Sequence, residues 1–407
     1  MTDRPILEHA VTRRAFLAGT SMAGFAAFLA ACNAPGAATP TPGGATTGPT
    51  EAPTEGPSAE PTEKPSPAAE LNFANWPLYI DTDDEDETKH KTLEDFTAEY
   101  GTVVNYSEVI NDNNEFFGTI RAPLEAGQDT GWDIIVLTEW MAGRIVRLGW
   151  AEKLDLGNVP NYVNNLVDVY KGPDFDPNNE YHAPWQAGMT GLGYDADVTG
   201  ELTSVNAYWD EQWAGRVTFL SEMRDCVGMA LARLGYSRTD VTTEQYDEAI
   251  AELQKAVDAN IVRAFTGNEY AEDLVSGNVV LAMAWSGDII QKQYERESLR
   301  FTVPDETGTL WYDNMLIPKG AQHKYTAELM IDFVYRPEIA AQIEAWVNYI
   351  CPVKGAQEEL AKIDEELAAS ELIFPSDATL AKVERFRTLT EEEESYMNDQ
   401  FSALIGV

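Results

Sequence analysis

The amino-acid sequence predicts an α/β protein whose folded part, about 338 residues from position 70 onward, forms two lobes. Short β-branched or aromatic runs alternate with amphipathic helical stretches, and this βαβ rhythm is typical of parallel sheets covered by helices. The folded part is also longer than one hydrophobic core comfortably organises. We therefore expect two α/β lobes with a ligand site between them.

The expected elements follow one another along the chain. Strand-like runs lie at residues 71–74, 103–106, 133–136, 191–194, 279–282 and 315–317. Helical stretches lie at about 88–100, 113–127, 243–258, 325–335 and 336–346. The sequence after Pro352 is rich in Glu and Lys and indicates a C-terminal helical cap.

Residues 1–31 predict an export signal. Arg13-Arg14 precede a run of small and apolar residues, 18–31, that is too short to span a bilayer comfortably. The pair of arginines resembles a twin-arginine signal, and the end of the run, up to Ala31-Cys32, resembles a lipobox. These resemblances imply cleavage before Cys32 and a lipid on its thiol. The alternative is a signal anchor with a free cysteine, which the small residues before Cys32 disfavour.

Residues 32–69 predict a disordered tether that begins at the lipidated Cys32. The stretch 33–69 holds nine of the chain's 21 prolines, with Thr, Gly, Ala and Glu between them and no aromatic residue. Such a composition cannot bury enough apolar surface to offset its chain entropy, and its prolines keep it extended. We expect it to hold the folded part away from the lipid surface.

The net charge of the chain limits the kinds of partner that it can bind. The net charge is −40, and residues 70–407 carry 62 acidic residues against 24 Lys and Arg. Nucleic acid is excluded as a partner because phosphate neutralisation needs basic clusters. A cationic ligand would be steered toward this surface. Solubility outside the cell, in salty surroundings, is the alternative explanation of the charge.

Two cysteines, Cys226 and Cys351, remain in the folded part. An exported protein meets an oxidising environment, which permits a disulfide. Two buried, unpaired thiols are equally compatible with the sequence, and both readings stay open.

Nothing in the sequence indicates catalysis. The segment Gly191-x-Gly193-x-x-Ala196 mimics a dinucleotide fingerprint, but the sequence after it reads as a loop rather than a helix. Phosphate-loop, zinc-protease and nucleophile-elbow motifs are absent, and the four histidines are scattered. We expect no enzyme activity, no cofactor and no metal.

Six short stretches of residues 70–407, in the right order, carry a resemblance to a known family. They are 72–79, 132–136, 175–181, 229–237, 283–287 and 311–313. The chain resembles the spermidine/putrescine-binding (polyamine) proteins of ABC importers. This implies a type II periplasmic-binding-protein fold, with two discontinuous α/β lobes joined by a two-crossover hinge. Lobe I would hold 70–187 and about 313–355, and lobe II about 188–312 and 356–407.

The resemblance also implies a ligand site. A polyamine needs acceptors for its ammonium ends and suits aromatic walls along its methylene chain. Positions that match the family's site supply both kinds of group. The aromatic walls would be Trp76, Tyr79, Trp140, Trp285, Trp311 and Tyr349. The anions would be Glu222, Asp225 and Asp313, with Thr138 as a hydroxyl partner.

Each site residue has a structural alternative. Trp76, Trp285 and Trp311 follow strand-like runs, where ligand sites gather, but tryptophans also fill cores. Glu222 and Asp225 lie at a helix start and could simply stabilise it. Arg224 between them could pair with one of the two carboxylates.

The sequence also departs from the family pattern. Pro77 and Leu78 replace polar residues that many members carry, Trp140 replaces a tyrosine, and the region of 385–386 lacks the family's C-terminal polar ligand. The preferred polyamine stays open. Asp133 also lies in a matching motif, but we expect its carboxylate to form hydrogen bonds with backbone groups and not with the ligand.

The predicted function is capture of putrescine or spermidine for a membrane permease, by a monomer anchored to the outer face of the bacterial cytoplasmic membrane. One alternative is the same fold with an oligosaccharide, an amino acid or a metal chelate. Sugar sites also stack aromatics but do not call for three carboxylates. The other alternative, an extracellular enzyme or an adhesive lipoprotein, is disfavoured by the absence of a catalytic constellation.

Overall fold

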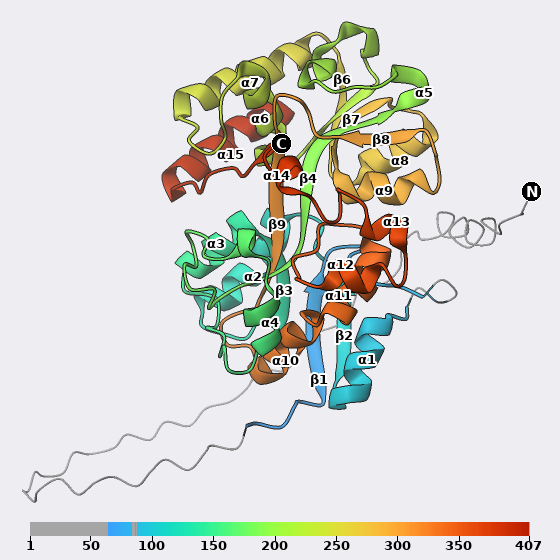
Figure 1. Ribbon diagram of the computed structural model, residues 1–407. Helices are drawn as coiled ribbons and strands as arrows, with labels where there is room; N and C mark the ends of the chain where they lie inside the picture. The colour runs from blue at the N-terminus through green and yellow to red at the C-terminus, as the bar shows by residue number, and fades with distance from the viewer. Residues whose placement is uncertain (1–63, 84–85, 87, 407) are drawn as a thin grey trace, which may run out of the picture. The chain divides into compact units, whose positions relative to one another are not determined.

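The computed structural model describes residues 64–406 except 84–85 and 87, and its strands, from Glu70 to Glu384, form one mixed ten-stranded sheet. The sheet has the order β2-β1-β3-β9-β4-β7-β5-β6, with β10 beside β9 and β8 beside β4. Figure 1 labels these strands except β5 and β10. They are β1 (Glu70–Asn75), β2 (Val103–Glu108), β3 (Ile134–Thr138), β4 (Ala183–Asp195), β5 (Val217–Leu220), β6 (Val262–Thr266), β7 (Leu281–Trp285), β8 (Leu299–Thr302), β9 (Gly308–Leu316) and β10 (Val383–Glu384).

Helices follow most strands. Those before β9 are α1 (Lys91–Tyr100), α2 (Asn113–Glu125), α3 (Glu139–Arg147), α4 (Pro160–Asn165), α5 (Ala196–Thr199), α6 (Met223–Leu234), α7 (Thr243–Asp258), α8 (Glu269–Ser276) and α9 (Ser286–Gln293). Those after it are α10 (Lys324–Val334), α11 (Pro337–Val347), α12 (Ala356–Leu360), α13 (Glu365–Ala368), α14 (Asp377–Leu380) and α15 (Glu391–Ile405). Among the described residues, no helix combines the length and the hydrophobicity needed to cross a membrane.

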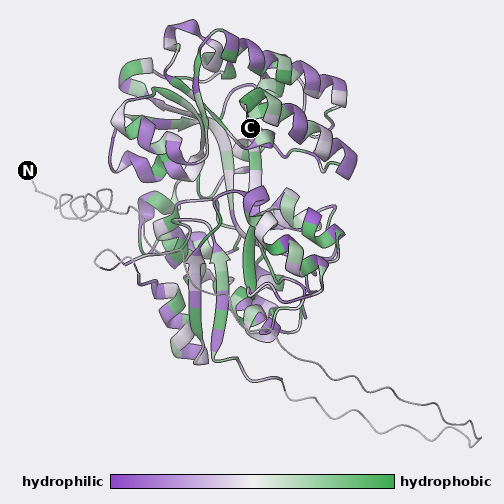
Figure 2. Ribbon diagram, turned by 180° about the vertical axis from the view of Figure 1, so that it is seen from behind, coloured by the Kyte–Doolittle hydropathy of each residue, from purple (hydrophilic) through white to green (hydrophobic). Residues whose placement is uncertain are grey.

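The buried side chains separate into the cores of two lobes. The first lobe contains the parallel strands β1, β2 and β3, and its core includes residues of α1, α3, α10 and α11. The second lobe contains the parallel strands β5, β6 and β7, and its core includes residues of α6, α7 and α15. Figure 2 shows mainly hydrophobic central strands and hydrophilic outer faces on the surrounding helices. The two-lobed α/β prediction is confirmed, and the residue boundaries of the lobes stay a prediction.

Strands β4 and β9 join the lobes. They pair antiparallel from Ala183↔Met315 to Thr190↔Thr309. At one end β9 pairs with β3 of the first lobe, and at the other end β4 pairs with β7 of the second lobe. All 13 residues of β4 are buried. In Figure 1 both strands run between the two groups of helices.

Most predicted elements match the structure. Helix α7 has the predicted bounds because a capping box at Thr242 and Gln245 fixes its start. Gly191 and Gly193 lie inside β4, where a Cβ would meet Thr302 O and Ala284 Cβ at 2.5 Å, so these glycines allow close strand packing. The segment expected as a loop after them begins instead with the one-turn helix α5, whose start Asp195 caps.

Two further expectations have outcomes in the structure. Cys226 and Cys351 are buried free thiols, so no disulfide joins them. Asp133 accepts bonds from the backbone N–H groups of Asn72 and His323, as expected for a structural carboxylate. The predicted twin-arginine signal, Cys32 and residues 32–63 of the tether lie outside the described residues.

Candidate functional site

A cleft with a volume of about 210 Å³ lies between the lobes, and all ten side chains predicted for the site line it. The first lobe and β9 contribute Trp76, Tyr79, Thr138, Trp140, Trp311, Asp313 and Tyr349. The second lobe contributes Glu222, Asp225 and Trp285. The cleft therefore brings together residues that are up to 273 positions apart in the sequence.

Asp313 is a buried carboxylate in the middle of β9, opposite Thr138 of β3. The Thr138 hydroxyl donates to Oδ1 at 2.7 Å, and the Tyr79 hydroxyl donates to Oδ2 at 2.8 Å. Asn113 in turn donates to Thr138 Oγ1. Burial raises the pKa of Asp313 to about 6 despite these bonds. Each oxygen retains a lone pair that can accept from a ligand.

Asp225 is the counterpart of Asp313 in the second lobe. The Thr190 hydroxyl donates to its Oδ1 at 2.8 Å, and Trp285 Nε1 donates to its Oδ2 at 2.9 Å. Burial raises its pKa as well. Each lobe thus presents one buried carboxylate that a hydroxyl and an aromatic side chain hold in place.

Glu222 caps helix α6, so the structural alternative for this residue is correct at least in part. Its side chain accepts from the backbone N–H of Arg224 at 3.2 Å. The same carboxyl group lines the cleft, and burial raises its pKa to about 8 although Arg224 opposes the shift. The Arg224 guanidinium lies 4.0 Å from it, as the sequence suggested.

The aromatic side chains form a connected wall. Ring centroids are separated by 6.2 Å between Trp285 and Trp311, 5.7 Å between Trp311 and Tyr349, and 5.4 Å between Tyr349 and Tyr79. Trp76 donates its indole N–H to the backbone of β3, at Val136 O. These contacts hold the five rings in place along the cleft, which all of them line.

Trp311 corrects one expectation. Trp76 and Trp285 lie at strand ends, as predicted, but Trp311 lies inside β9. Because β9 crosses between the lobes, the side chains on one face of its middle, Trp311 and Asp313, line the cleft. Two glycines let the aromatic wall pack closely on the backbone. A Cβ on Gly188 would lie 2.3 Å from the Trp311 ring, and one on Gly287 would lie 2.4 Å from the Tyr349 ring.

Substitution of Gly188 by alanine tests the close packing of the Trp311 ring on Gly188. The added methyl group cannot coexist with the Trp311 ring, so we expect a loss of about 1–3 kcal/mol in the free energy of unfolding and a changed tryptophan emission. The control is Gly118→Ala, since Gly118 lies in α2 with open space at its Cβ. Urea unfolding and fluorescence spectra measure both effects. A Gly188→Ala protein as stable as the parent, with the same emission, would show that Trp311 does not pack closely on Gly188.

Sequence reasoning missed four charged residues of the cleft, the first of which is Asp112, the N-cap of α2. Asp288 accepts from Tyr349, Tyr270 and Asn268, and Glu139 accepts from the backbone N–H of Tyr312. Glu139 directly follows Thr138, the last residue of β3, and Asp288 comes three residues after Trp285, the last residue of β7. This closeness to a strand end is the signal that could have indicated them. The fourth residue, Arg224, lies over the Trp140 ring, 4.0 Å from its centroid.

The residues that depart from the family pattern lie in or beside the cleft. Leu78 has a left-handed backbone (φ 56°), and its N–H donates to Glu108. The Leu78 side chain is exposed, and Pro77 lines the cleft without a side-chain acceptor. Phe386 lines the cleft near the place of the missing C-terminal polar ligand.

The side chains that line the cleft carry many more negative than positive charges. Of the described residues that line it, six are carboxylates and Arg224 is the one Lys or Arg side chain. Burial raises the pKa of most of these carboxyl groups, with Glu139 at about 7. A buried carboxylate without a counter-charge is costly. The arrangement can therefore bind a small cation with an apolar body.

Comparisons with known proteins show the family of the chain. The model of the family described as "Bacterial extracellular solute-binding protein" matches residues 91–374. The spermidine/putrescine-binding periplasmic protein of Escherichia coli K12 is 29% identical over 312 residues, which cover 76% of this chain and 84% of that protein. A putrescine-binding periplasmic protein of Pseudomonas aeruginosa UCBPP-PA14 is 28% identical over 353 residues, covering 82% and 91%.

A solved structure gives the same relationship. The putative spermidine/putrescine ABC transporter from Listeria monocytogenes superposes with a TM-score of 0.72 at 25% identity, covering 83% of this chain and 99% of that one. The resemblance drawn from six short stretches, and the two-lobed fold that it implied, are confirmed.

Proposed function

The chain belongs to the family of bacterial extracellular solute-binding proteins, and from this premise we propose that it captures a polyamine, putrescine or spermidine, for an ABC importer. The single observation that carries the proposal is the pair Asp313 and Asp225. These two carboxylates lie on opposite lobes, are held by hydroxyl and aromatic donors, and flank an aromatic wall. A flexible chain with an ammonium at each end fits such a pair.

The ten cleft residues have distinct roles in this proposal. Asp313, Asp225 and Glu222 accept from ammonium groups, and the six aromatic side chains cover the methylene chain. The hydroxyl of Thr138 is engaged by Asp313 and Asn113, so Thr138 orients the anion. Asp288, which three donors hold, extends the acidic surface.

The mechanism is capture without chemistry. A di- or triamine enters between the lobes, and the lobes close about the crossover strands β4 and β9. Ligand contacts made by both lobes favour the closed form, which docks on a membrane permease. The names of the relatives support this role, since they are binding proteins for spermidine and putrescine.

We also infer how the protein is placed in the cell. The Arg13-Arg14 signal exports the chain, a lipid on Cys32 anchors it to the outer face of the cytoplasmic membrane, and residues 32–69 form the tether. A tether of this length gives a monomeric receptor reach to a permease in the same membrane. Palmitate labelling of the parent chain and of Cys32→Ser tests the anchor. Equal labelling would exclude lipidation at Cys32.

Calorimetric titration tests the proposed ligand class. The chain with Cys32→Ser is titrated with putrescine, spermidine and maltose, an uncharged solute that also stacks on aromatic rings. We expect saturable binding of at least one polyamine and none of maltose. Binding of maltose and of neither polyamine would instead support the alternative of a sugar-binding protein.

The raised pKa values predict that polyamine affinity depends on pH. Burial raises the free-state pKa of Glu222 to about 8, of Glu139 to about 7 and of Asp313 to about 6. A bound ammonium favours the ionised forms and lowers these pKa values. Affinity is therefore full above about pH 8 and falls as the pH drops toward 6, because protons must leave on binding.

Titrations with spermidine at pH 8.5, 7 and 5.5, at one ionic strength, measure this dependence. The released protons also appear as a heat that differs between buffers of different ionisation enthalpy. An affinity that stays constant or rises on acidification would contradict the proposed contacts between carboxylates and ammonium groups.

A further inference from the structure

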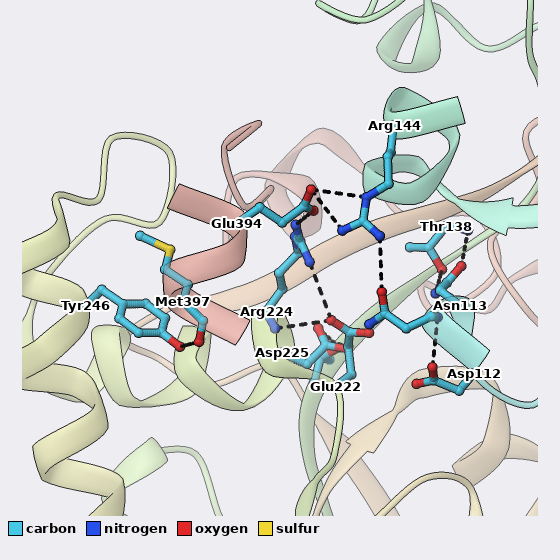
Figure 3. Close-up of polar contacts among 12 residues, drawn as sticks. Asp112, Asn113, Thr138, Arg144, Glu222, Arg224, Asp225, Tyr246, Glu394 and Met397 are labelled. Atoms are coloured by element: carbon cyan, nitrogen blue, oxygen red, sulfur yellow. Dashed lines mark hydrogen bonds and ion pairs between the residues drawn. The ribbon is translucent and has the colours of Figure 1, made fainter. Parts of the chain in front are cut away.

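Three residues outside the predicted site form an ion-pair cluster between the lobes. Glu394 of α15 accepts from Arg144 of α3, with Nη2 to Oε2 at 2.9 Å, and from Arg224 of α6, with Nη2 to Oε1 at 2.7 Å. Figure 3 shows the Glu394 carboxylate between the two guanidinium groups. Arg147 of α3 adds a longer contact of 3.9 Å.

The members of this cluster are anchored in different cores. Met141 and Ile145 of α3 belong to the core of the first lobe. Met397 and Phe401 of α15 belong to the core of the second lobe, and Tyr246 of α7 donates its hydroxyl to Met397 O. The Glu394–Arg144 pair therefore joins the two lobes, and a motion that separates the lobes would separate its two members.

Burial makes this pair different from a surface ion pair. The exposed fraction of the side chain is 6% for Glu394, 7% for Arg224 and 20% for Arg144. Exposed pairs contribute little, but removal of one partner from a buried pair leaves the other charge uncompensated. Loss of Glu394 would leave the arginines of two lobes facing each other without a counter-charge.

The cluster is connected to the ligand cleft through Arg224. Its guanidinium lies over the ring of Trp140, a cleft residue of the first lobe, and beside Glu222 of the second. The Arg144 guanidinium also lies 5.3 Å from the Trp140 ring centroid. Opening of the lobes would break the Glu394–Arg144 pair and the Arg224–Trp140 contact together.

We propose that Glu394 is a positioning residue that holds the two lobes closed and so sets how slowly a captured ligand leaves. Glu394 does not line the cleft; it acts by joining Arg144 of one lobe to Arg224 of the other. The inference rests on the proposed function in one respect, namely that ligand is captured between closing lobes. It does not depend on which polyamine is bound.

The test compares Glu394→Gln with Glu391→Gln. Glu391 lies in the first turn of the same helix and is exposed, so the control removes the same charge without the cluster. Stopped-flow tryptophan fluorescence gives the association and dissociation rates of spermidine. We expect about tenfold faster dissociation for Glu394→Gln, less than a twofold change in association, and no change for Glu391→Gln.

Arg144→Met supplies a second variant from the opposite lobe. It should also speed dissociation, and the double variant Arg144→Met/Glu394→Gln should release spermidine no faster than the faster single variant, within about twofold. Such non-additivity is expected of partners in one contact. Effects that multiply in the double variant, or a Glu394→Gln rate within twofold of the parent, would overturn the proposal.

An inter-lobe distance gives a readout that a local structural role would not move. Dyes on Val163→Cys of the first lobe and Val198→Cys of the second report it by energy transfer, in a Cys32→Ser background whose two other cysteines are buried. Glu394→Gln should shift the ligand-free protein toward longer distances, and Glu391→Gln should not. If the parent fails to bind spermidine, the proposed ligand is wrong and this distance alone decides the inference: an unchanged distance overturns it.

Discussion

Replacement of Asp313 by asparagine is expected to weaken spermidine binding by about 10- to 150-fold. A hydrogen bond to a charged group contributes about 1.5–3 kcal/mol, and each 1.4 kcal/mol is a factor of ten in affinity. Asparagine is nearly isosteric and can still accept from Thr138 or Tyr79, so the cleft should keep its shape. The measurement is calorimetric titration at pH 8, where the carboxyl group of the parent is ionised.

The matched control for Asp313→Asn is Asp332→Asn. Asp332 is also a buried carboxylate, but it lies on α10 and accepts from Asn161, away from the cleft. Both variants remove one negative charge, so the control separates the local bond from the long-range field. A change of less than twofold in Asp313→Asn would show that this anion is wrongly assigned.

Replacement of Trp285 by alanine is expected to weaken spermidine binding by about 30- to 300-fold. The indole ring is a face for an ammonium or a methylene chain, a contact of about 0.5–2 kcal/mol, and its N–H orients Asp225. Its loss also removes a neighbour of Trp311 and Tyr270 from the aromatic wall. Both the contact and the orientation of the anion are therefore lost.

Trp285→Phe separates these two contributions, because phenylalanine keeps a ring and lacks the N–H donor. We expect it to bind more weakly than the parent and more tightly than Trp285→Ala. Trp346→Phe is the control for a general loss of a tryptophan, since Trp346 packs on the first core and does not line the cleft. Equal spermidine affinity for Trp285→Ala and the parent would remove Trp285 from the site.

The sequence predicted the local elements well where the signals are local. The amphipathic patterns placed α7, α10 and α11 within one residue at each end, because caps and periodicity are encoded in neighbouring residues. The cleft residues were predicted through resemblance to the family, and the chemistry of a polyamine agreed with their types. Their roles in binding still await the titrations.

The features that the sequence did not predict depend on contacts between distant parts of the chain. Glu394 and Arg224 are separated by 170 positions, and no local pattern marks them as partners. Gly191 and Gly193 mimicked a dinucleotide-binding fingerprint, because closely packed strands also require glycines at short spacing. Trp311 was expected after a strand, because the sequence does not reveal that β9 continues across the lobes.

A crystal structure of the chain with spermidine is the most direct measurement of capture between the two lobes. We expect one ammonium nitrogen within hydrogen-bond distance of Asp313, another beside Asp225 or Glu222, and the methylene chain against Trp285 and Trp311. A ligand bound elsewhere, or one that places its methylene chain rather than an ammonium against Asp313, would contradict the proposed function.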